Sequence, residues 1–312
     1  MNIVPPSFEV LDHLDRLNLA VRIEYCGRIC YKSEDQINRD SALPFVVKMA
    51  EHGHNSVLEM GVVTLRVSGA NADRIAELYA TQPRYLHIDR SDGTGLLITG
   101  SIRAFREMLI FHPDCTLVHN LAAFLARRHP YFFSTIIPES GLAPDPAITV
   151  AKVELPEVDR LDAPQREKHR FIAVKFIVNR AVTHEIVRHR PCSFLQESQR
   201  YCRYADHKFG GEVTFIKPMF FAGDSPEYAL WKKAMEDSER TYLQLLATSS
   251  PQAARTVLPN SCKTEIIVYA NLAEWRHIFN LRTTKAAEPS MREVMIPLQA
   301  DFRERFAEIF SA

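Results

Sequence analysis

Apolar residues recur along the N-terminal part of the chain with two different periods. Residues 15–31 and 42–52 carry apolar side chains three and four positions apart, which predicts amphipathic helices. Residues 62–67 read Val-Val-Thr-Leu-Arg-Val and are followed by Ser68 and Gly69, a pattern typical of a strand and its end. This part of the chain is therefore expected to combine helices with strands.

Residues 70–170 have a weaker pattern. The patterns at residues 71–80 and 101–111 predict two helices, and Ser101 is expected to cap the second of them. Residues 89–94 are rich in turn formers. Residues 134–166 contain five prolines and several acidic residues, and we expect them to form a loop or connector. We find no internal repeat in the sequence.

The C-terminal part has clearer boundaries. Apolar segments predict buried strands at residues 171–178 and 264–270 and a shorter strand at residues 213–217. Ser225 and Ser250 each precede a proline, the arrangement of a helix cap followed by proline at the first helical position. The helices predicted here are residues 181–189, 226–246, 251–258 and 272–282, the last with Asn271 as cap and Glu274 in a capping box.

Strands and helices do not alternate regularly, so we favour an α+β fold with a mixed sheet and packed helices. We treat residues 1–312 as a single domain. The sequence has no Gly-x-Gly-x-x-Gly segment and no Walker loop, which argues against a Rossmann or P-loop nucleotide site.

Composition and charge narrow the class of protein. The chain is 46% hydrophobic and 24% charged, as in globular proteins. Lys plus Arg and Asp plus Glu both number 38, and this balance argues against a protein that coats nucleic acid. No segment approaches the roughly 18 apolar residues that span a membrane, and no signal peptide is seen. We therefore expect neither a nucleic-acid nor a membrane partner.

The six cysteines are scattered and form no Cys-x-x-Cys pair. This pattern is typical of reduced thiols, so we predict a cytoplasmic protein. The histidines show no spacing typical of a metal site, and no metal is expected. A metal shared by His52, His54 and a carboxylate is the alternative.

Several arginines converge just after a predicted helix. Arg188 and Arg190 flank His189, and Arg200 and Tyr201 follow shortly after. A guanidinium presents a fork of donors that suits bidentate capture of phosphate, and a tyrosine ring can stack on a base. The pattern predicts a site for a phosphorylated nucleotide or cofactor. The alternative is a solvated basic face paired with nearby acidic residues.

The arginine-rich segment resembles the signature of the flavin-dependent thymidylate synthase family. That signature is Arg-His-Arg, seven residues and Ser, and this sequence extends it with Gln-Arg-Tyr. Three further blocks match the family in the same order. The four matching blocks are residues 54–59 (His-Asn-Ser-Val-Leu-Glu), 188–201, 254–259 (Ala-Arg-Thr-Val-Leu-Pro) and 271–282 (Asn to Leu-Arg). The resemblance covers about residues 45–69 and 171–300.

The resemblance implies a flavin-dependent thymidylate synthase-like fold and a homotetramer whose active sites draw residues from several subunits. It implies methylation of 2′-deoxyuridine 5′-monophosphate (dUMP) at C5, with methylenetetrahydrofolate as carbon donor, FAD as cofactor and NADPH as reductant. Two alternatives stay open. One is a UMP-preferring methylase of nucleoside natural-product biosynthesis, and the other is a non-catalytic nucleotide- or RNA-binding relative.

Residue roles follow from the resemblance position by position. The implied catalytic residue is Arg282, held against the pyrimidine, where positive charge stabilises the anion that develops as C5 becomes nucleophilic. The residues implied to bind the nucleotide are Glu185, Arg188, Gln196, Glu197, Ser198, Gln199, Arg200, Arg255 and Arg282. The residues implied to bind the flavin are His54, Ser56, Arg188, His189, Arg190, Gln196, Asn271 and His277.

The sequence also departs from the family pattern. Met60 replaces a usual histidine, Gln196 a frequent glutamate, Ala273 a frequent arginine and His277 a common asparagine. More than a hundred residues separate the first block from the signature, so we interpret residues of about 70–170 as an insertion. These departures leave the sugar of the substrate undecided.

Overall fold

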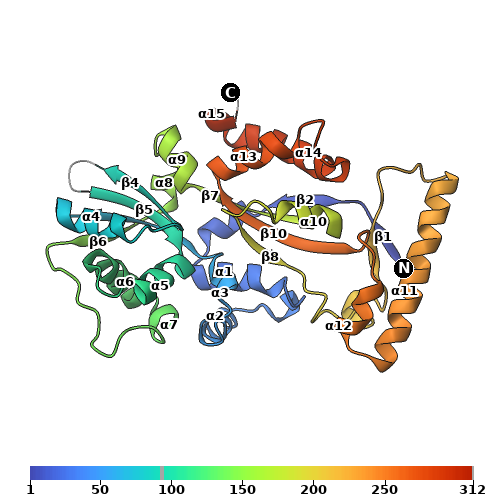
Figure 1. Cartoon of the computed structure of the whole chain (residues 1–312), viewed down its shortest axis with the longest axis horizontal. Coiled ribbons are helices and arrows are strands. Elements are labelled where there is room, and N and C mark those ends of the chain that lie inside the picture. The colour runs from blue at the N-terminus through green and yellow to red at the C-terminus, as the bar shows by residue number, and fades with distance from the viewer. Residues whose placement is uncertain (92–94, 311–312) are drawn as a thin grey trace.

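The computed structural model describes residues 1–91 and 95–310 and contains two four-stranded antiparallel sheets and one short parallel pair (Figure 1). The strands are β1 (Asn2–Val4), β2 (Ser7–Val10), β3 (Val62–Ser68), β4 (Leu86–Ser91), β5 (Gly95–Ser101), β6 (Thr149–Val153), β7 (Phe171–Asn179), β8 (Ser193–Gln196), β9 (Thr214–Ile216) and β10 (Lys263–Asn271). The α-helices are α1 (Leu19–Arg28), α2 (Ala42–Glu51), α3 (Asn55–Leu58), α4 (Ala72–Ala80), α5 (Ile102–Phe111), α6 (Thr116–Arg128), α7 (Pro130–Phe133), α8 (Leu155–Val158), α9 (Ala163–His169), α10 (Arg180–Ile186), α11 (Pro226–Thr248), α12 (Pro251–Ala254), α13 (Leu272–Arg282), α14 (Pro289–Arg305) and α15 (Ala307–Phe310). The prediction of an α+β fold with packed helices is confirmed.

One of the four-stranded sheets has the strand order β2-β7-β10-β8, and we call it the second sheet because most of its strands come later in the chain. It is buried on both faces. Ile266 and Val268 of β10 pack with α13 and α14, whereas Ile267 and Tyr269 pack into the core that surrounds α1 to α3. The two groups of helices lie on opposite sides of this sheet in Figure 1. Burial on both faces explains why β7 and β10 are nearly continuous apolar segments that the sequence pattern identified.

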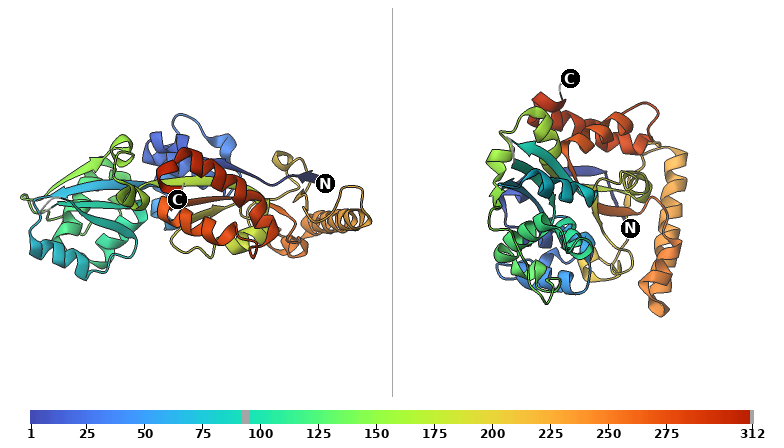
Figure 2. Two further views of the ribbon diagram at one scale, coloured as in Figure 1. Left: turned by 90° about the horizontal axis from the view of Figure 1, so that it is seen from above. Right: turned by 60° about the vertical axis from the view of Figure 1, so that its left-hand side comes forward.

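The first sheet has the strand order β4-β5-β3-β6 and lies at the opposite end of the molecule from α11 (Figures 1 and 2). Helices α4, α5 and α6 pack on one face through residues such as Ile75, Phe105 and Leu121. A smaller group of apolar side chains, which includes Leu97 and Val158, covers the other face. Residues 70–170 therefore supply most of an ordered sheet and its helices.

The two large sheets repeat one topology. Read from β8, the second sheet runs β8-β10-β7-β2, and the first sheet runs β4-β5-β3-β6. The register also repeats, because the first residue of β3 pairs with the last of β5 (Val62 with Ser101) and the first residue of β7 pairs with the last of β10 (Phe171 with Asn271). Ser101 and Asn271 then cap the helix that follows, α5 or α13.

We call residues 7–133 the first half and residues 149–310 the second half. Each half gives its first strand to the sheet of the other half: β2 pairs with β7, and β6 pairs with β3. No repeat is visible in the amino-acid sequence, but the structure repeats the strand order and the register. Strand order and register depend on burial patterns that many residue combinations satisfy, so they persist where side chains differ.

The loop predicted for residues 134–166 is present at residues 134–148, which form no helix or strand, but the prediction is wrong for residues 149–166. This segment contains β6, α8 and the start of α9. Pro156 and Pro164 lie in the first turn of α8 and α9. The N–H groups of a first turn have no acceptor within the helix, so a proline is tolerated there and marks the start of each helix.

Two further boundaries differ from the sequence prediction. Residues 89–91 end β4 and do not form a turn, and residues 92–94 lie outside the described residues. Helix α10 ends at Ile186, so Arg188 to Arg190 lie in the loop before β8. The capping box at Asn271 is half formed: the Glu274 N–H donates to Asn271 Oδ1 at 2.9 Å, but the Glu274 carboxylate lies near His189.

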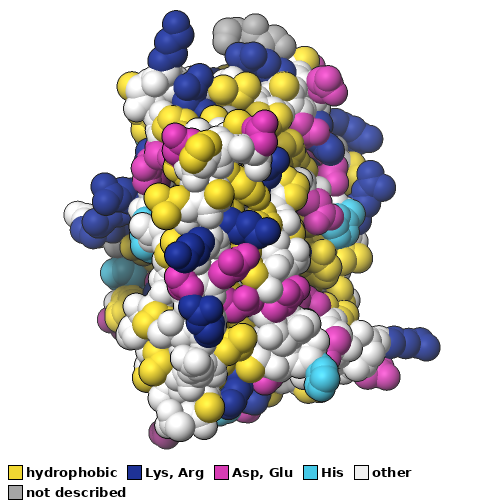
Figure 3. Space-filling model, turned by 90° about the vertical axis from the view of Figure 1, so that its right-hand side faces the viewer, with side chains coloured by type: hydrophobic (Ala, Val, Ile, Leu, Met, Phe, Trp, Pro, Cys, Tyr) yellow, Lys and Arg dark blue, Asp and Glu magenta, His cyan; other side chains and the backbone are white. Residues whose placement is uncertain are grey.

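Helix α11 is long and stands at one edge of the molecule (Figure 1). Ser225 caps it, and only Met235, Tyr242 and Leu246 of its residues are buried. On this side of the molecule acidic, basic and apolar side chains are interspersed (Figure 3), so no broad basic surface forms there. No helix in the described part of the chain is both long and apolar enough to cross a membrane.

The six cysteines are free thiols, and five of them are buried. Burial raises the pKa of Cys26 to about 12 and also raises the pKa of Cys192, the cysteine inside the signature. Because the thiolate is the reactive form, the raised pKa makes the Cys192 thiol less reactive.

Candidate functional site

Arg282, the last residue of α13, is held in place by the loop that follows α10. Its Nη1 donates to Glu185 Oε2 at 2.7 Å, its Nη2 donates to the Glu185 carbonyl oxygen at 3.1 Å, and its Nε donates to His189 Nε2 at 3.1 Å. Three contacts fix the plane of the guanidinium. The structure therefore holds the positive charge of Arg282 in a fixed position at the end of α13, beside the signature loop.

His189 connects this arginine to the rest of α13. Its ring is buried, and because Nε2 accepts from Arg282, its proton is assigned to Nδ1. That nitrogen lies 3.4 Å from Glu274 Oε1, and the ring packs edge-on against His277 at 5.7 Å between centroids. We call Glu185, His189, Glu274, His277 and Arg282 the Arg282 cluster. Four of these five residues were candidates from the sequence, and Glu274 was identified only as a capping residue.

The sequence predicted no metal, yet three potential ligands gather in this cluster. Ligand atoms of His189, Glu274 and His277 lie within 4.8 Å of one another. The Arg282 guanidinium donates to the same histidine. A fixed positive charge beside a ligand opposes a bound cation, so the arrangement favours a hydrogen-bonded group that orients Arg282.

Glu197 and Gln199, which the resemblance assigns to the nucleotide, are buried in protein contacts. Glu197 accepts from Tyr204 Oη at 2.8 Å and from Lys263 Nζ at 2.9 Å. Gln199 Nε2 lies 3.5 Å from Cys262 Sγ. Burial opposes the charge on Lys263, but Glu197 and a neighbouring glutamate raise its pKa, so the lysine keeps its charge. In this chain these side chains brace the end of the second sheet.

Gln196 lies beside the same network. Its Nε2 donates to Thr183 Oγ1 at 3.1 Å and to Thr264 Oγ1 at 3.2 Å. The Thr183 hydroxyl already donates to the Arg180 carbonyl oxygen at 2.9 Å, so it can accept from an amide but cannot also donate to the glutamate frequent in the family. The departure at Gln196 therefore has a local structural explanation.

Two of the matching blocks meet at the surface. Tyr31 Oη lies 3.4 Å from His54 Nδ1, and the Tyr31 and Tyr201 rings lie 5.1 Å apart. The Arg200 guanidinium lies over the Tyr201 ring at 5.5 Å. We call these four residues the His54–Tyr201 surface. It is largely exposed and combines flat rings with a cation, which suits a ligand with an aromatic ring and a negative charge.

Ser56 and Ser198 flank this surface. Ser56 is exposed on α3, two residues after His54. The Ser198 backbone N–H donates to the Cys30 carbonyl oxygen at 3.0 Å, and its hydroxyl accepts from the Arg200 N–H at 3.3 Å. Ser198 therefore fixes the loop that carries Arg200. Arg255 lies apart, half-buried in the short turn after α12.

Arg190 lines a cleft of about 460 Å³ between the two halves. The second half contributes Phe171, Arg190 and Ser193 to its walls, and the first half contributes Arg84 and Tyr85, with Glu59 and Arg103 beside them. We call this hollow the Arg190 cleft. Sequence reasoning missed its first-half residues because they fall in the segment interpreted as an insertion. The signal was present: Arg84 precedes a strand, as Arg190 does.

Some charged side chains of the Arg190 cleft are paired with an opposite charge and others are not. Arg103 pairs with Glu59 at 2.6 Å and with Glu107 at 2.7 Å. Arg84 and Arg190 of this cleft are exposed, as is Arg188, two residues before Arg190, and among residues 1–91 and 95–310 their side chains have no ion-pair partner. The cleft therefore presents uncompensated guanidiniums, which suit a phosphate group.

In one chain His54 precedes α3 and Arg282 ends α13, and these two helices pack on opposite faces of the second sheet. No hydrogen bond or ion pair joins the Arg282 cluster to the His54–Tyr201 surface within the described residues. The structure thus brings Glu185, His189, His277 and Arg282 together, and it brings His54, Ser198 and Arg200 together, but as two groups.

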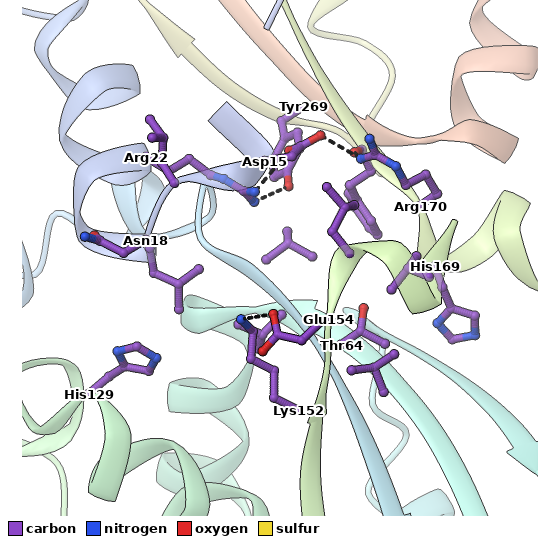
Figure 4. A pocket seen from close by; sticks show the side chains of 18 residues that line it. Asp15, Asn18, Arg22, Thr64, His129, Lys152, Glu154, His169, Arg170 and Tyr269 are labelled. Atoms are coloured by element: carbon purple, nitrogen blue, oxygen red, sulfur yellow. Dashed lines mark hydrogen bonds and ion pairs between the residues drawn. The ribbon is translucent and has the colours of Figure 1, made fainter. Parts of the chain in front are cut away.

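A further pocket, of about 180 Å³, lies where the halves meet (Figure 4). Asp15 lies between Arg22, at 3.0 Å, and Arg170, at 2.7 Å, and Arg22 Nη1 donates to Tyr269 Oη at 2.7 Å. Burial raises the pKa of Asp15 while both arginines oppose that change. We call Asp15, Arg22, Arg170 and Tyr269 the Asp15 junction. Its groups satisfy one another, so its role is structural.

His169 lines the same pocket and is a buried neutral base. Burial lowers the pKa of His169 to about 4, and its Nδ1 lies 2.8 Å from the Thr99 hydroxyl, which in turn lies 2.8 Å from the Thr64 hydroxyl. This chain of hydrogen bonds ties α9 to the first sheet.

Comparison with known proteins agrees with the signature. Residues 167–306 match the family model described as thymidylate synthase complementing protein. The flavin-dependent thymidylate synthase of Pyrococcus abyssi is 35% identical over 128 residues, which are 41% of this chain and 52% of the relative. That of Corynebacterium efficiens is 31% identical over 149 residues, which are 43% of this chain and 57% of the relative. The chain spans about half the length of the curated relatives it matches.

One solved structure covers almost the whole chain. A UMP/dUMP methylase, PolB from Streptomyces cacaoi bound with 5-Br dUMP, is 12% identical and covers 97% of this chain and 93% of its own. The TM-score is 0.41. The family resemblance seen in the signature is confirmed by the sequence relatives.

Proposed function

We propose that this chain methylates C5 of a uridine 5′-monophosphate with the help of a flavin, because residues 167–306 match the model described as thymidylate synthase complementing protein and the curated relatives are flavin-dependent thymidylate synthases. We propose dUMP as the preferred substrate. The observation that carries the proposal is the fixed guanidinium of Arg282, held by Glu185 and His189. An enzyme that makes a carbon nucleophilic needs positive charge placed in advance beside the developing anion.

The contacts of Arg282 leave it able to act on a ligand. Of its five N–H donors, three are used by Glu185 and His189, which leaves two. Because the bound donors fix the plane, the free donors have a fixed direction. We propose that they meet the pyrimidine edge that carries negative charge as C5 becomes nucleophilic. His189, neutral and buried, holds the arginine without adding a competing charge.

The remaining residues fit a nucleotide and a flavin by their chemistry. The uncompensated guanidiniums of Arg188 and Arg190 suit phosphate groups, and the His54–Tyr201 surface suits a ring. When bound, FAD supplies the hydride chemistry, with NADPH as its reductant and methylenetetrahydrofolate as carbon donor. We propose that His54, Ser56, Arg188 and Arg190 bind FAD directly.

We propose that three other candidate residues hold neighbouring segments in place and do not contact a ligand. The Asn271 side chain accepts from the Glu274 N–H and donates to the Lys168 carbonyl oxygen at 3.1 Å. Both of its polar groups are therefore used by protein, and we propose that Asn271 sets the direction of α13 and thereby of Arg282. Glu197 and Gln199 likewise support the loop that carries Ser198 and Arg200.

The separation of the two groups of candidates bears on assembly. We propose that the chain forms a homotetramer in which the Arg282 cluster of one subunit meets the His54–Tyr201 surface of another. Sedimentation velocity at micromolar concentration is expected to give a particle of four chains. A monomer that turns over dUMP would contradict shared sites, because each chain by itself keeps the two groups apart.

Tritium release from C5-labelled dUMP and UMP tests the proposed activity and its sugar preference. With FAD, NADPH and methylenetetrahydrofolate, we expect faster release from dUMP. Preferential release from UMP would favour a methylase of nucleoside products. A protein that binds flavin and nucleotide but releases tritium from neither would be a binding-only relative, and the proposed methylation would be wrong.

A further inference from the structure

The repeated topology identifies a counterpart of the Arg282 cluster in the first half. Ser193 pairs with Tyr269 and His87 pairs with Thr99, in each case two residues before the neighbouring strand ends. Arg190 and Arg84 each lie three residues earlier, so they are equivalent by register.

The helices that follow can be aligned from their caps. Ser101 caps α5 and Asn271 caps α13, so Ala104 is equivalent to Glu274 and His112 to Arg282. The charged groups of the second half are therefore lost or replaced in the first half.

An apolar pocket of about 280 Å³ lies at this counterpart position. Leu86, Met108 and Phe111 line it, with Arg84 and His112 also on its wall. Phe111 is 68% exposed although it is aromatic, so its ring forms an open wall and not part of the core. We call this hollow the first-half pocket. An apolar hollow with an exposed aromatic wall suits a flat ring.

The first-half pocket adjoins the Arg190 cleft. Arg84, Tyr85, Ala104 and Glu107 line both hollows. Arg84 stands at the boundary, and its register equivalent Arg190 stands in the cleft. Two exposed guanidiniums that lack ion-pair partners among the described residues thus line a cleft that adjoins an apolar pocket. A ligand with a dianionic group between the two arginines and a flat ring in the apolar pocket would fit this arrangement.

We propose that the first half binds the adenosine diphosphate end of the flavin dinucleotide, with the diphosphate between Arg84 and Arg190 and the adenine in the first-half pocket. This rests on the proposed function for the identity of the cofactor. The half that lacks the Arg282 cluster then contributes affinity for the cofactor, and each chain carries one flavin site. It also gives residues 70–170 a role in the site.

Binding of FAD, riboflavin and ADP to four variants tests this assignment. Phe111→Ser removes the aromatic wall, and Ile110→Ser is its control, since Ile110 is an exposed neighbour on α5 that lines neither hollow. Arg84→Ala removes the boundary cation, and Arg90→Ala is the control on β4. We expect Phe111→Ser and Arg84→Ala to weaken FAD and ADP about tenfold or more and to leave riboflavin unchanged. The two controls should bind all three ligands as the unchanged protein does.

The outcomes separate this assignment from the proposed function. If the unchanged protein binds FAD and both variants bind FAD and ADP equally well, the first-half site is wrong while flavin dependence stands. If the unchanged protein binds neither flavin but binds ADP, and the variants lose ADP, the proposed function fails and the pocket stands as an adenine nucleotide site. If the unchanged protein does not bind ADP, the assignment is wrong.

Discussion

Replacing Arg282 with alanine is expected to lower the rate of tritium release from C5-labelled dUMP by about 10²–10³-fold, the usual cost of removing one preorganised charge beside a developing anion. Flavin binding should persist, because the residues proposed to bind FAD directly lie outside α13. Measuring the release rate and the flavin absorbance of the same sample separates the two effects. Arg282→Lys should recover only part of the rate, since an ammonium cannot reproduce the guanidinium plane.

Arg276→Ala is the matched control for this prediction. Arg276 is on the same helix and also forms an ion pair, with Glu167 at 2.5 Å, but it is exposed. Its loss should leave the release rate within about twofold, because exposed ion pairs contribute little. Equal losses from Arg276→Ala and Arg282→Ala would mean that the helix, and not the Arg282 charge, is what matters. Loss of flavin from Arg282→Ala would also contradict the assigned role.

Replacing Asp15 with alanine is expected to lower the free energy of unfolding by about 3–5 kcal/mol, because it leaves Arg22 and Arg170 buried without their shared carboxylate. Arg22 belongs to α1 in the first half, and Arg170 directly precedes β7 in the second half. The Asp15 junction therefore joins the two halves of the chain. Urea denaturation measures this loss, because the midpoint and the slope of the transition together give the free energy of unfolding. We expect a lower midpoint for the variant.

Asp12→Ala tests whether burial causes this effect. Asp12 lies three residues away, is exposed and pairs with Arg305 at 2.6 Å. Its loss is expected to cost about 1 kcal/mol or less. Similar midpoints for Asp12→Ala and Asp15→Ala would show that the Asp15 junction does not hold the halves together.

The elements that the sequence predicted well are those whose signals are local. A cap directly before an apolar run identified α5 and α13, and the apolar segments of β7 and β10 are long because both faces of their sheet are buried. Arg282 was identified by its spacing within a family block, and its contact with His189 places it beside the signature loop. The site as a whole remains a prediction until a ligand is bound.

The elements that were missed depend on distant partners. Strand β4 reads Leu-His-Ile-Asp-Arg-Ser, with too many polar residues to be recognised, and it is held by pairing with β5. The burial of Glu197 depends on Lys263, which lies 66 residues further along the chain. The repeat was invisible because Gln82 and Pro83 stand where the second half has Arg188 and His189, so only strand register reveals it. Whether residues 1–312 form one domain also remains a prediction.

The central claim is that this chain transfers a methyl group to C5 of dUMP only with a flavin. The most direct measurement is tritium release from C5-labelled dUMP by the unchanged protein, with methylenetetrahydrofolate and NADPH, in the presence and absence of FAD. The account predicts release with FAD and none after the flavin has been removed. Release that continues unchanged without flavin, or no release from a protein that has bound both FAD and dUMP, would contradict it.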